Sequence, residues 1–122
     1  MILVDTSVWI NHLRDGDRYL EKQLLDGGVW SHTFIISELA CGNIKNRKEI
    51  ISLLLALPMS PQVEFREYLY FIERHQLNGR GIGFVDIHLL ASAQLGQIKL
   101  WTADKRLMSA AASLGLKYEK KK

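Results

Sequence analysis

The sequence has little of several residue types that mark whole protein classes. Its single cysteine, Cys41, cannot form a disulfide within the chain, and we expect a reducing compartment, the cytoplasm. Two prolines and no repetitive or biased stretch in the 122 residues exclude a disordered chain. The mostly apolar run at 50–57 is too short to cross a bilayer, so we expect neither a membrane span nor a targeting segment.

Charge of one sign is also scarce outside the C-terminus. The chain has 16 Lys and Arg against 13 Asp and Glu, a net charge of +3. Residues 117–122 hold four lysines and one glutamate, and they therefore account for the whole excess. Because the rest of the chain is close to neutral, its composition alone does not predict a surface that binds nucleic acid.

The apolar residues, 48% of the chain, are enough for one domain with a core of its own. Short apolar segments that predict strands alternate with segments of helical spacing. The predicted strands are 2–4, 29–30 and 98–101, with a further candidate at 116–118, and the predicted helices are 8–13, 19–25, one ending at 41 with Ser31 or Thr33 as its cap, 45–57, 61–76, 87–95 and 105–114. This order predicts an α/β domain, residues 1–118, with a mainly parallel central sheet flanked by helices, followed by a basic tail, 119–122.

Four acidic residues occupy informative places in this pattern. Asp5 directly follows the first predicted strand, and Asp104 lies three residues after the third. Ligands of parallel sheets collect beyond the carboxyl ends of the strands, and two helical acids, Glu38 and Asp86, can reach the same edge. Simpler roles stay open for each: Asp5 and Asp86 as helix caps, Asp104 as a favourable charge at a helix start, and Glu38 as a solvated helix acid.

Carboxylates that gather at one edge need a partner. Two of them 4 Å apart repel by about 4 kcal/mol at an effective dielectric constant near 20. Such a cluster therefore either holds protons or binds a cation, and oxygen ligands favour Mg²⁺ or Mn²⁺ over zinc. A divalent ion among carboxylates can activate water and stabilise charge on a phosphate, which makes phosphodiester hydrolysis the natural use of the site.

Four ordered motifs cover nearly the whole chain. They are ILVDTSVWI at 2–10, ISEL at 36–39, FVDIHLLASA at 84–93 and LWTADKRL at 100–107. Together they resemble the PIN domain, and most closely the VapC-type toxins of bacterial and archaeal toxin–antitoxin pairs. The resemblance implies a metal-dependent endoribonuclease that cleaves structured RNA, such as transfer or ribosomal RNA. It also implies a cognate VapB-type antitoxin that neutralises the enzyme, and a homodimer.

The resemblance also assigns roles to residues. By position, the family's acidic quartet corresponds to Asp5, Glu38, Asp86 and Asp104, with Asp5 and Asp86 as the direct ligands of Mg²⁺ or Mn²⁺. Ser7 corresponds to a small polar residue that supports the metal site. Thr102 corresponds to one that steadies the fourth acid.

Other features allow more than one interpretation. The basic candidates for contacts with the RNA backbone are Arg80, Lys45, Arg47 and Lys48, although a solvated face explains the last three equally well. The aromatic stretch 65–71 belongs either to the core or to an interface with a second copy or an antitoxin. The four histidines lack the spacing of metal ligands, and we expect them at the surface or on helix flanks, with substrate contact as the alternative for His12 and His32.

Two other protein classes share parts of this pattern. A signalling receiver domain also has an acid after its first strand, but it needs a second acid beside the first, and here Asp5 is followed by Thr6 and Ser7. It also needs a phosphate-accepting aspartate near mid-chain, where this sequence has leucines at 53–55. A binding module that keeps the fold without the chemistry is the second alternative.

Overall fold

The computed structural model of the chain, which describes residues 1–121, contains a small parallel sheet at its centre. Its strands are β1 (Ile2–Val4), β2 (Val29–Trp30) and β3 (Lys99–Trp101), in the order β2-β1-β3. In the register of this sheet, Ile2 of β1 lies opposite Val29 on one side and Lys99 on the other. The predicted parallel sheet is confirmed, and the carboxyl ends of all three strands lie at one edge.

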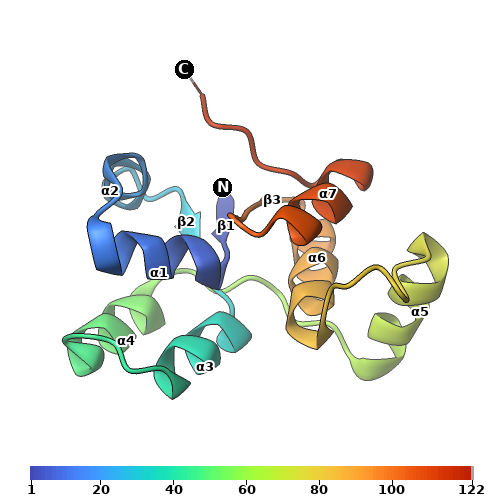
Figure 1. Ribbon diagram of the computed structural model, residues 1–122, viewed down its shortest axis with the longest axis horizontal. Coiled ribbons are helices and arrows are strands. Elements are labelled where there is room, and N and C mark those ends of the chain that lie inside the picture. The colour runs from blue at the N-terminus through green and yellow to red at the C-terminus, as the bar shows by residue number, and fades with distance from the viewer. Residues whose placement is uncertain (122) are drawn as a thin grey trace.

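Helices connect the strands and cover them from both sides. Within residues 1–121 they are α1 (Thr6–Asp15), α2 (Arg18–Leu25), α3 (Thr33–Cys41), α4 (Arg47–Ala56), α5 (Phe65–His75), α6 (Phe84–Gly96) and α7 (Lys105–Ser113). Figure 1 shows α1 to α4 on one side of the strands and α5 to α7 on the other. The α/β class with flanking helices is therefore confirmed. None of the helices in this part of the chain is long and apolar enough to cross a membrane.

The central strand fixes the position of the edge. Leu3 and Val4 of β1 are completely buried, and Leu100 of β3 packs in the same core. The middle of α6 is buried as well, with Leu89 and Leu90 fully inaccessible. Burying each such side chain stabilises the fold by about 1.5–3 kcal/mol. Any shift of β1 along its axis would lose this stabilisation for several side chains. The residue that follows β1 is held at a defined place.

Several helix starts differ from the predicted ones. The first helix begins at Thr6 and not at residue 8, because the carbonyl of Asp5 already accepts from the backbone N–H of Val8 at 3.1 Å. Helix α5 begins at Phe65 and not at residue 61. The backbone at Glu64 is extended, and its N–H donates to the Glu67 carboxylate at 3.2 Å, which closes the start of the helix there.

Three more boundaries are corrected by local geometry. Helix α6 begins at Phe84, so Asp86 is its third residue and not its cap. Helix α4 begins at Arg47, because Asn46 takes the left-handed conformation with φ 55°. Neither Ser31 nor Thr33 caps α3: the Nδ1 atom of His32 accepts from the backbone N–H of Phe34 at 3.0 Å.

The C-terminal segment packs on the domain. Residue Lys117 forms an isolated parallel bridge with Leu100 where a further strand was a candidate. Beyond it, the backbone N–H of Lys121 donates to the Tyr19 hydroxyl at 3.1 Å, and the ammonium group of Lys120 lies 5.3 Å from the centre of the Tyr19 ring. These contacts place the described part of the predicted tail against α2, and Lys122 lies outside the described residues.

Candidate active site

Asp5 is buried at the carboxyl end of β1 and is positioned by two hydroxyl groups. Its Oδ2 atom accepts a hydrogen bond from Ser7 Oγ at 2.7 Å and another from Thr102 Oγ1 at 2.8 Å. Only 5% of the residue is exposed, so these bonds replace much of the solvation that the carboxylate loses. Within residues 1–121 both side-chain hydrogen bonds go to Oδ2, which leaves Oδ1 as the oxygen available for a further ligand.

The same two hydroxyl groups tie the loop after β3 to Asp5. The backbone N–H of Ala103 donates to Ser7 Oγ at 3.0 Å, and the N–H of Asp104 donates to Thr102 Oγ1 at 3.0 Å. Asp104 itself caps α7, since its Oδ1 accepts from the N–H of Leu107 at 3.0 Å. Asp104, for which the sequence suggested a favourable charge at a helix start, is therefore the cap of α7, and its Oδ2 atom takes no part in the cap.

Glu38 and Asp86 come to this edge from two helices. The Glu38 carboxylate on α3 accepts a hydrogen bond from Thr6 Oγ1 at 2.7 Å, at the first residue of α1. The Asp86 carboxylate, in the first turn of α6, accepts only a long bond of 3.4 Å from the backbone N–H of Gly83. The two helices bring these acids towards the end of β1.

Electrostatics shows that the four carboxylates share one region. Burial raises the pKa of the Asp86 carboxyl, although the hydrogen bond from Gly83 opposes the shift. The negative charges of Asp5, Asp104 and Glu38 each raise this pKa further. Three acids that are far apart in the sequence therefore interact electrostatically with the carboxyl group of Asp86.

These charges have no basic partner in the described part of the chain. The ion pairs within residues 1–121 join Arg14 to Asp15 and Lys117 to Glu119, both away from the cluster. The donor chemistry, anionic oxygens without a compensating cation, fits a hard divalent ion. The distances between the ligands do not yet match a metal site. In this structure no three Asp, Glu, His or Cys side chains of residues 1–121 are close enough together to hold a metal ion. The residues thus fit such an ion by charge and ligand type.

The predicted basic candidates lie on the periphery. Lys45, Lys48 and Arg80 are exposed, and Arg47 donates from Nε to the carbonyl of Ala40 at 3.0 Å, at the end of α3. The sequence analysis missed Arg106, whose guanidinium lies against Gly81 in the loop before α6. A Cβ atom at Gly81 would be 2.6 Å from Arg106 Nη1, and the φ of 76° disfavours a side chain as well.

Two histidines are not where the sequence analysis placed them. His88 is buried, and its ring stacks on Tyr68 with centroids 4.2 Å apart. His32 is buried too, with Nε2 and Ser92 Oγ 3.0 Å apart. Burial lowers the pKa of His88, and burial together with the charge of His88 lowers that of His32 to about 4. The prediction of surface positions is wrong for both, and their burial excludes the substrate contact considered for His32.

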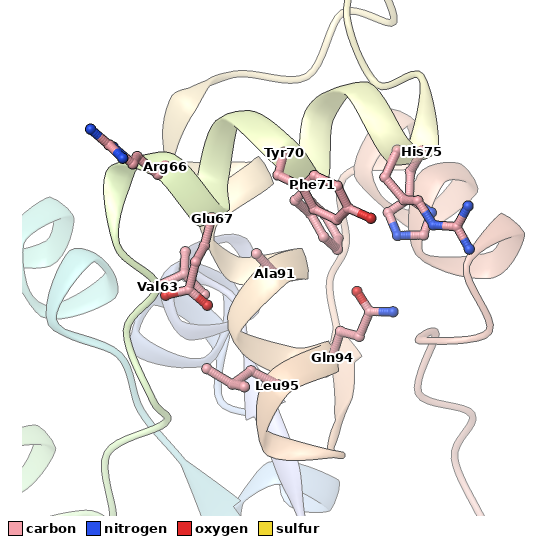
Figure 2. A pocket seen from close by; sticks show the side chains of 10 residues that line it. Val63, Arg66, Glu67, Tyr70, Phe71, His75, Ala91, Gln94 and Leu95 are labelled. Carbon is pink, nitrogen blue, oxygen red and sulfur yellow. The ribbon is translucent and has the colours of Figure 1, made fainter.

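The aromatic stretch of α5 divides between core and surface. Tyr68 and Phe71 are buried, whereas Phe65 and Tyr70 are exposed. Figure 2 shows the groove of about 630 Å³ between α5 and α6, with side chains of both helices directed into it. It is lined by Val63, Arg66, Glu67, Tyr70, Phe71, Arg74, His75, Ala91, Gln94 and Leu95. None of the four acids borders this groove, so it lies apart from the candidate active site.

A second hollow, of about 530 Å³, does reach an acid of the cluster. It lies between α3 and the start of α6 and is lined by Phe34, Ser37, Glu38, Cys41, Phe84 and Val85. Glu38 is thus shared by the hollow and the acidic edge. The rings of Phe34 and Phe84 have centroids 5.7 Å apart and planes 28° apart, which is a stacked arrangement. No sequence signal marked these two residues for function.

Comparison with known proteins places this geometry in a family. The model of the PIN domain family matches residues 2–113. The chain is 48% identical over 117 residues to the protein named Ribonuclease VapC32, from two strains of Mycobacterium tuberculosis, CDC 1551 / Oshkosh and ATCC 25618 / H37Rv. In both cases the match covers 95% of this chain and 94% of the relative.

A solved structure supports the fold at a greater distance. The crystal structure of PAE2754 from Pyrobaculum aerophilum superimposes with a TM-score of 0.62 at 16% identity, covering 89% of this chain and 78% of that one. At this identity the likeness concerns the fold alone. Because the family match spans nearly all of the domain and the close relatives match end to end, this chain belongs to the PIN-domain family and, within it, to the VapC group.

Proposed function

We propose that this chain is a divalent-metal-dependent endoribonuclease of the toxin type that cleaves structured RNA, transfer or ribosomal RNA, in the cytoplasm. The observation that carries the proposal is the group of four carboxylates at one edge of the sheet. Three of them raise the pKa of the fourth, Asp86, and the group has no basic partner among residues 1–121. The 48% identity to a protein named as a ribonuclease supports it independently.

Asp5 and Asp86 are the residues that would hold Mg²⁺ or Mn²⁺. When bound, such an ion supplies an activated water and stabilises charge on the phosphate. Ser7 and Thr102 hold Asp5 in one orientation through Oδ2, so that Oδ1 faces the ligand side. Orienting a carboxylate in advance avoids the cost of ordering it when the ion binds.

Glu38 and Asp104 complete the anionic region from the two flanks. The hydroxyl of Thr6 fixes one oxygen of Glu38, and the start of α7 fixes one oxygen of Asp104. In our proposal, their remaining oxygens would accept hydrogen bonds from water and so would hold a water that attacks the phosphodiester. Both residues therefore act on water, and Asp5 and Asp86 act on the ion.

The proposed ribonuclease function also predicts what the chain binds. RNA backbone contacts fall to the exposed basic residues Arg80, Lys45, Arg47 and Lys48, to which the structure adds Arg106. A VapB-type antitoxin would neutralise the enzyme, and two copies of the chain would form a homodimer. The PIN-domain match leaves the receiver-domain alternative without support, whereas a catalytically silent module with the same fold makes a different prediction in the test below.

The test is RNA cleavage by the purified protein. Wild type with Mg²⁺ or Mn²⁺ should cut transfer or ribosomal RNA, and a chelator should stop the reaction. Asp86→Asn keeps the shape of the side chain and removes its charge, so cleavage should fall by at least about a thousandfold, the scale of several kcal/mol that a catalytic ion contributes.

The matched control is Asp15→Asn, an exposed aspartate at the end of α1, which should cleave like wild type. Wild-type protein that cuts no RNA in either metal would favour the silent module. Full activity of Asp86→Asn, or cleavage that continues in the chelator, would contradict the assignment of the site.

A further inference from the structure

The hollow beside Glu38 contains an exposed aromatic surface that is not part of the hydrophobic core. Phe84 is 55% exposed, although it is the first residue of a helix whose middle is fully buried. Its ring stacks on the half-buried Phe34 of α3. Exposing this much of a phenylalanine ring forgoes burial that would stabilise the fold, and it leaves the ring available to a ligand that enters the hollow.

The rings behind Phe84 hold it in place. Its centroid lies 4.6 Å from that of His88, one helical turn further along α6, and 5.3 Å from that of Tyr68 on α5. Phe34 contacts the same histidine with centroids 4.9 Å apart. A ring fixed by three aromatic neighbours, with one side left accessible, is a rigid platform and not a mobile surface side chain.

The platform adjoins the acidic edge. Phe84 lies two residues before Asp86 in the first turn of α6, and Glu38 lines the same hollow as Phe84. A polynucleotide with a phosphate at the acids would therefore have a neighbouring nucleotide at the hollow. The hollow has apolar lining residues, Phe34, Phe84 and Val85, and polar ones, Ser37 and Glu38.

We infer that this hollow is a nucleobase subsite, in which an unpaired base next to the scissile phosphate stacks on Phe84. The inference rests on the proposed ribonuclease function and names the part of the RNA that it reads. A base is flat and uncharged, so it can stack on a ring beside carboxylates that repel phosphate. Its polar edge meets Ser37 and Glu38, which can accept from its amino groups.

The subsite requires an unpaired nucleotide. A base within a duplex is already stacked and hydrogen-bonded, and its faces are inaccessible to a protein ring. The enzyme should therefore cut structured RNA within loops or bulges and leave continuous duplex intact. The preference comes from stacking, which every base can do, and so it selects unpaired positions more strongly than any one base.

The first experiment compares steady-state cleavage of a single-stranded RNA by Phe84→Ala, Phe84→Tyr and a control, Phe65→Ala. Losing one base stack should raise KM about tenfold, with kcat changed much less. Phe84→Tyr keeps the ring and should stay within about twofold of wild type. Phe65, the first residue of α5, is also an exposed phenylalanine, at 65%, but it does not line the hollow, and its loss should leave KM unchanged.

A merely structural role for Phe84 would give a different pattern. In that case kcat and thermal stability would fall together with little change in KM, and the inference would be overturned. An unchanged KM in a folded Phe84→Ala protein would overturn it as well. Wild type that cleaves no RNA is a separate failure, that of the proposed function.

A second measurement needs no substitution in the platform. Cys41 is exposed, lines the hollow and is the only cysteine of the chain, so a maleimide labels this position alone. A single-stranded RNA decamer containing 2-aminopurine, with Ca²⁺ in place of Mg²⁺, should slow the labelling and lose fluorescence as the base stacks. The same sequence as a duplex should do neither. Equal labelling rates with both RNAs would refute the subsite even if Phe84→Ala failed to fold.

Discussion

Two groups of ionisable residues near the start of α6, the acids and the histidines, have opposite surroundings. At the acidic edge, Asp5 and Asp86 sit among other carboxylates, and hydroxyl groups hold Asp5 in place. His88, two residues after Asp86 on α6, and His32, the cap of α3, are instead packed among aromatic rings, and burial lowers the pKa of both. The acids keep unbalanced charge, whereas the histidines lose theirs.

This contrast separates function from stability. Unbalanced charge costs free energy, and a protein retains it where a ligand will compensate it. Neutral buried histidines cost little, and they contribute packing, a helix cap and a hydrogen bond to Ser92. Titratable residues close together on the same two helices therefore have different roles, which three substitutions can test.

The largest expected effect concerns the pH dependence of stability. An unfolded histidine titrates near 6.5, and His32 in the folded chain titrates at about 4. The folded state thus binds fewer protons, and the free energy of unfolding should fall as the pH drops from 6.5 to 4. The loss should be on the order of 3 kcal/mol, measured by urea unfolding at a series of pH values.

His32→Asn separates this effect from other titrations. Asparagine can cap α3 as His32 does, but it does not titrate in this range. The variant should be less stable than wild type at pH 7, because it loses the bond to Ser92, and its stability should depend less on pH. A pH dependence equal to that of wild type would show that the histidine cluster is not what titrates.

The next effect concerns the hydroxyl support of Asp5. Thr102→Val keeps the side-chain shape and removes the donor to Asp5 Oδ2 and the acceptor for the Asp104 N–H. Losing such support around a metal ligand lowers metal affinity or activity about 10–100-fold. Titrating the cleavage rate with Mg²⁺ measures this loss. Thr102→Ser retains the hydroxyl and should behave like wild type, and identical curves for the two variants would remove Thr102 from the site.

The smallest effect is a gain in stability. The pKa of Asp86 is raised above its ordinary value, so at pH 7 its charge destabilises the folded state. Asp86→Asn should therefore be somewhat more stable than wild type in a chelator, and the gain is small because solvent screens part of the repulsion. Added Mg²⁺ should then stabilise wild type and not the variant. A variant that unfolds more easily in the chelator would mean that the charge of Asp86 has a structural partner.

Much of this fold could be predicted, because its signals are local. The apolar residues of β1 end abruptly at Asp5, and the glycines at 79, 81 and 83 mark the loop before α6. Helix starts were harder, since they depend on which group accepts the first free N–H. The ring nitrogen of His32 does this for α3, and no propensity scale favours histidine over its neighbours Ser31 and Thr33 there.

The site was only partly accessible from sequence. Parallel strands bring Asp5 and the loop of Asp104 to one edge, and this follows from topology. For Glu38 and Asp86 the pattern showed only that they could reach this edge, and the resemblance to PIN domains gave them their roles. Phe84 and Phe34 gave no signal, because an aromatic residue on an apolar helix predicts core until its exposure is known. His88 was placed at the surface for the converse reason: its burial depends on rings from α3 and α5.

The hydrogen bonds of Thr102 have a consequence for biosynthesis. They join the beginning of the chain to its last quarter, since Thr102 lies 97 residues beyond Asp5. A ribosome that has made only the first ninety residues has already produced Asp5, Glu38 and Asp86, yet it has made neither the third strand of the sheet nor this threonine. A chain truncated there keeps the Ser7 hydroxyl but lacks the Thr102 hydroxyl and β3, so we expect the site to take its final form only when synthesis is nearly finished.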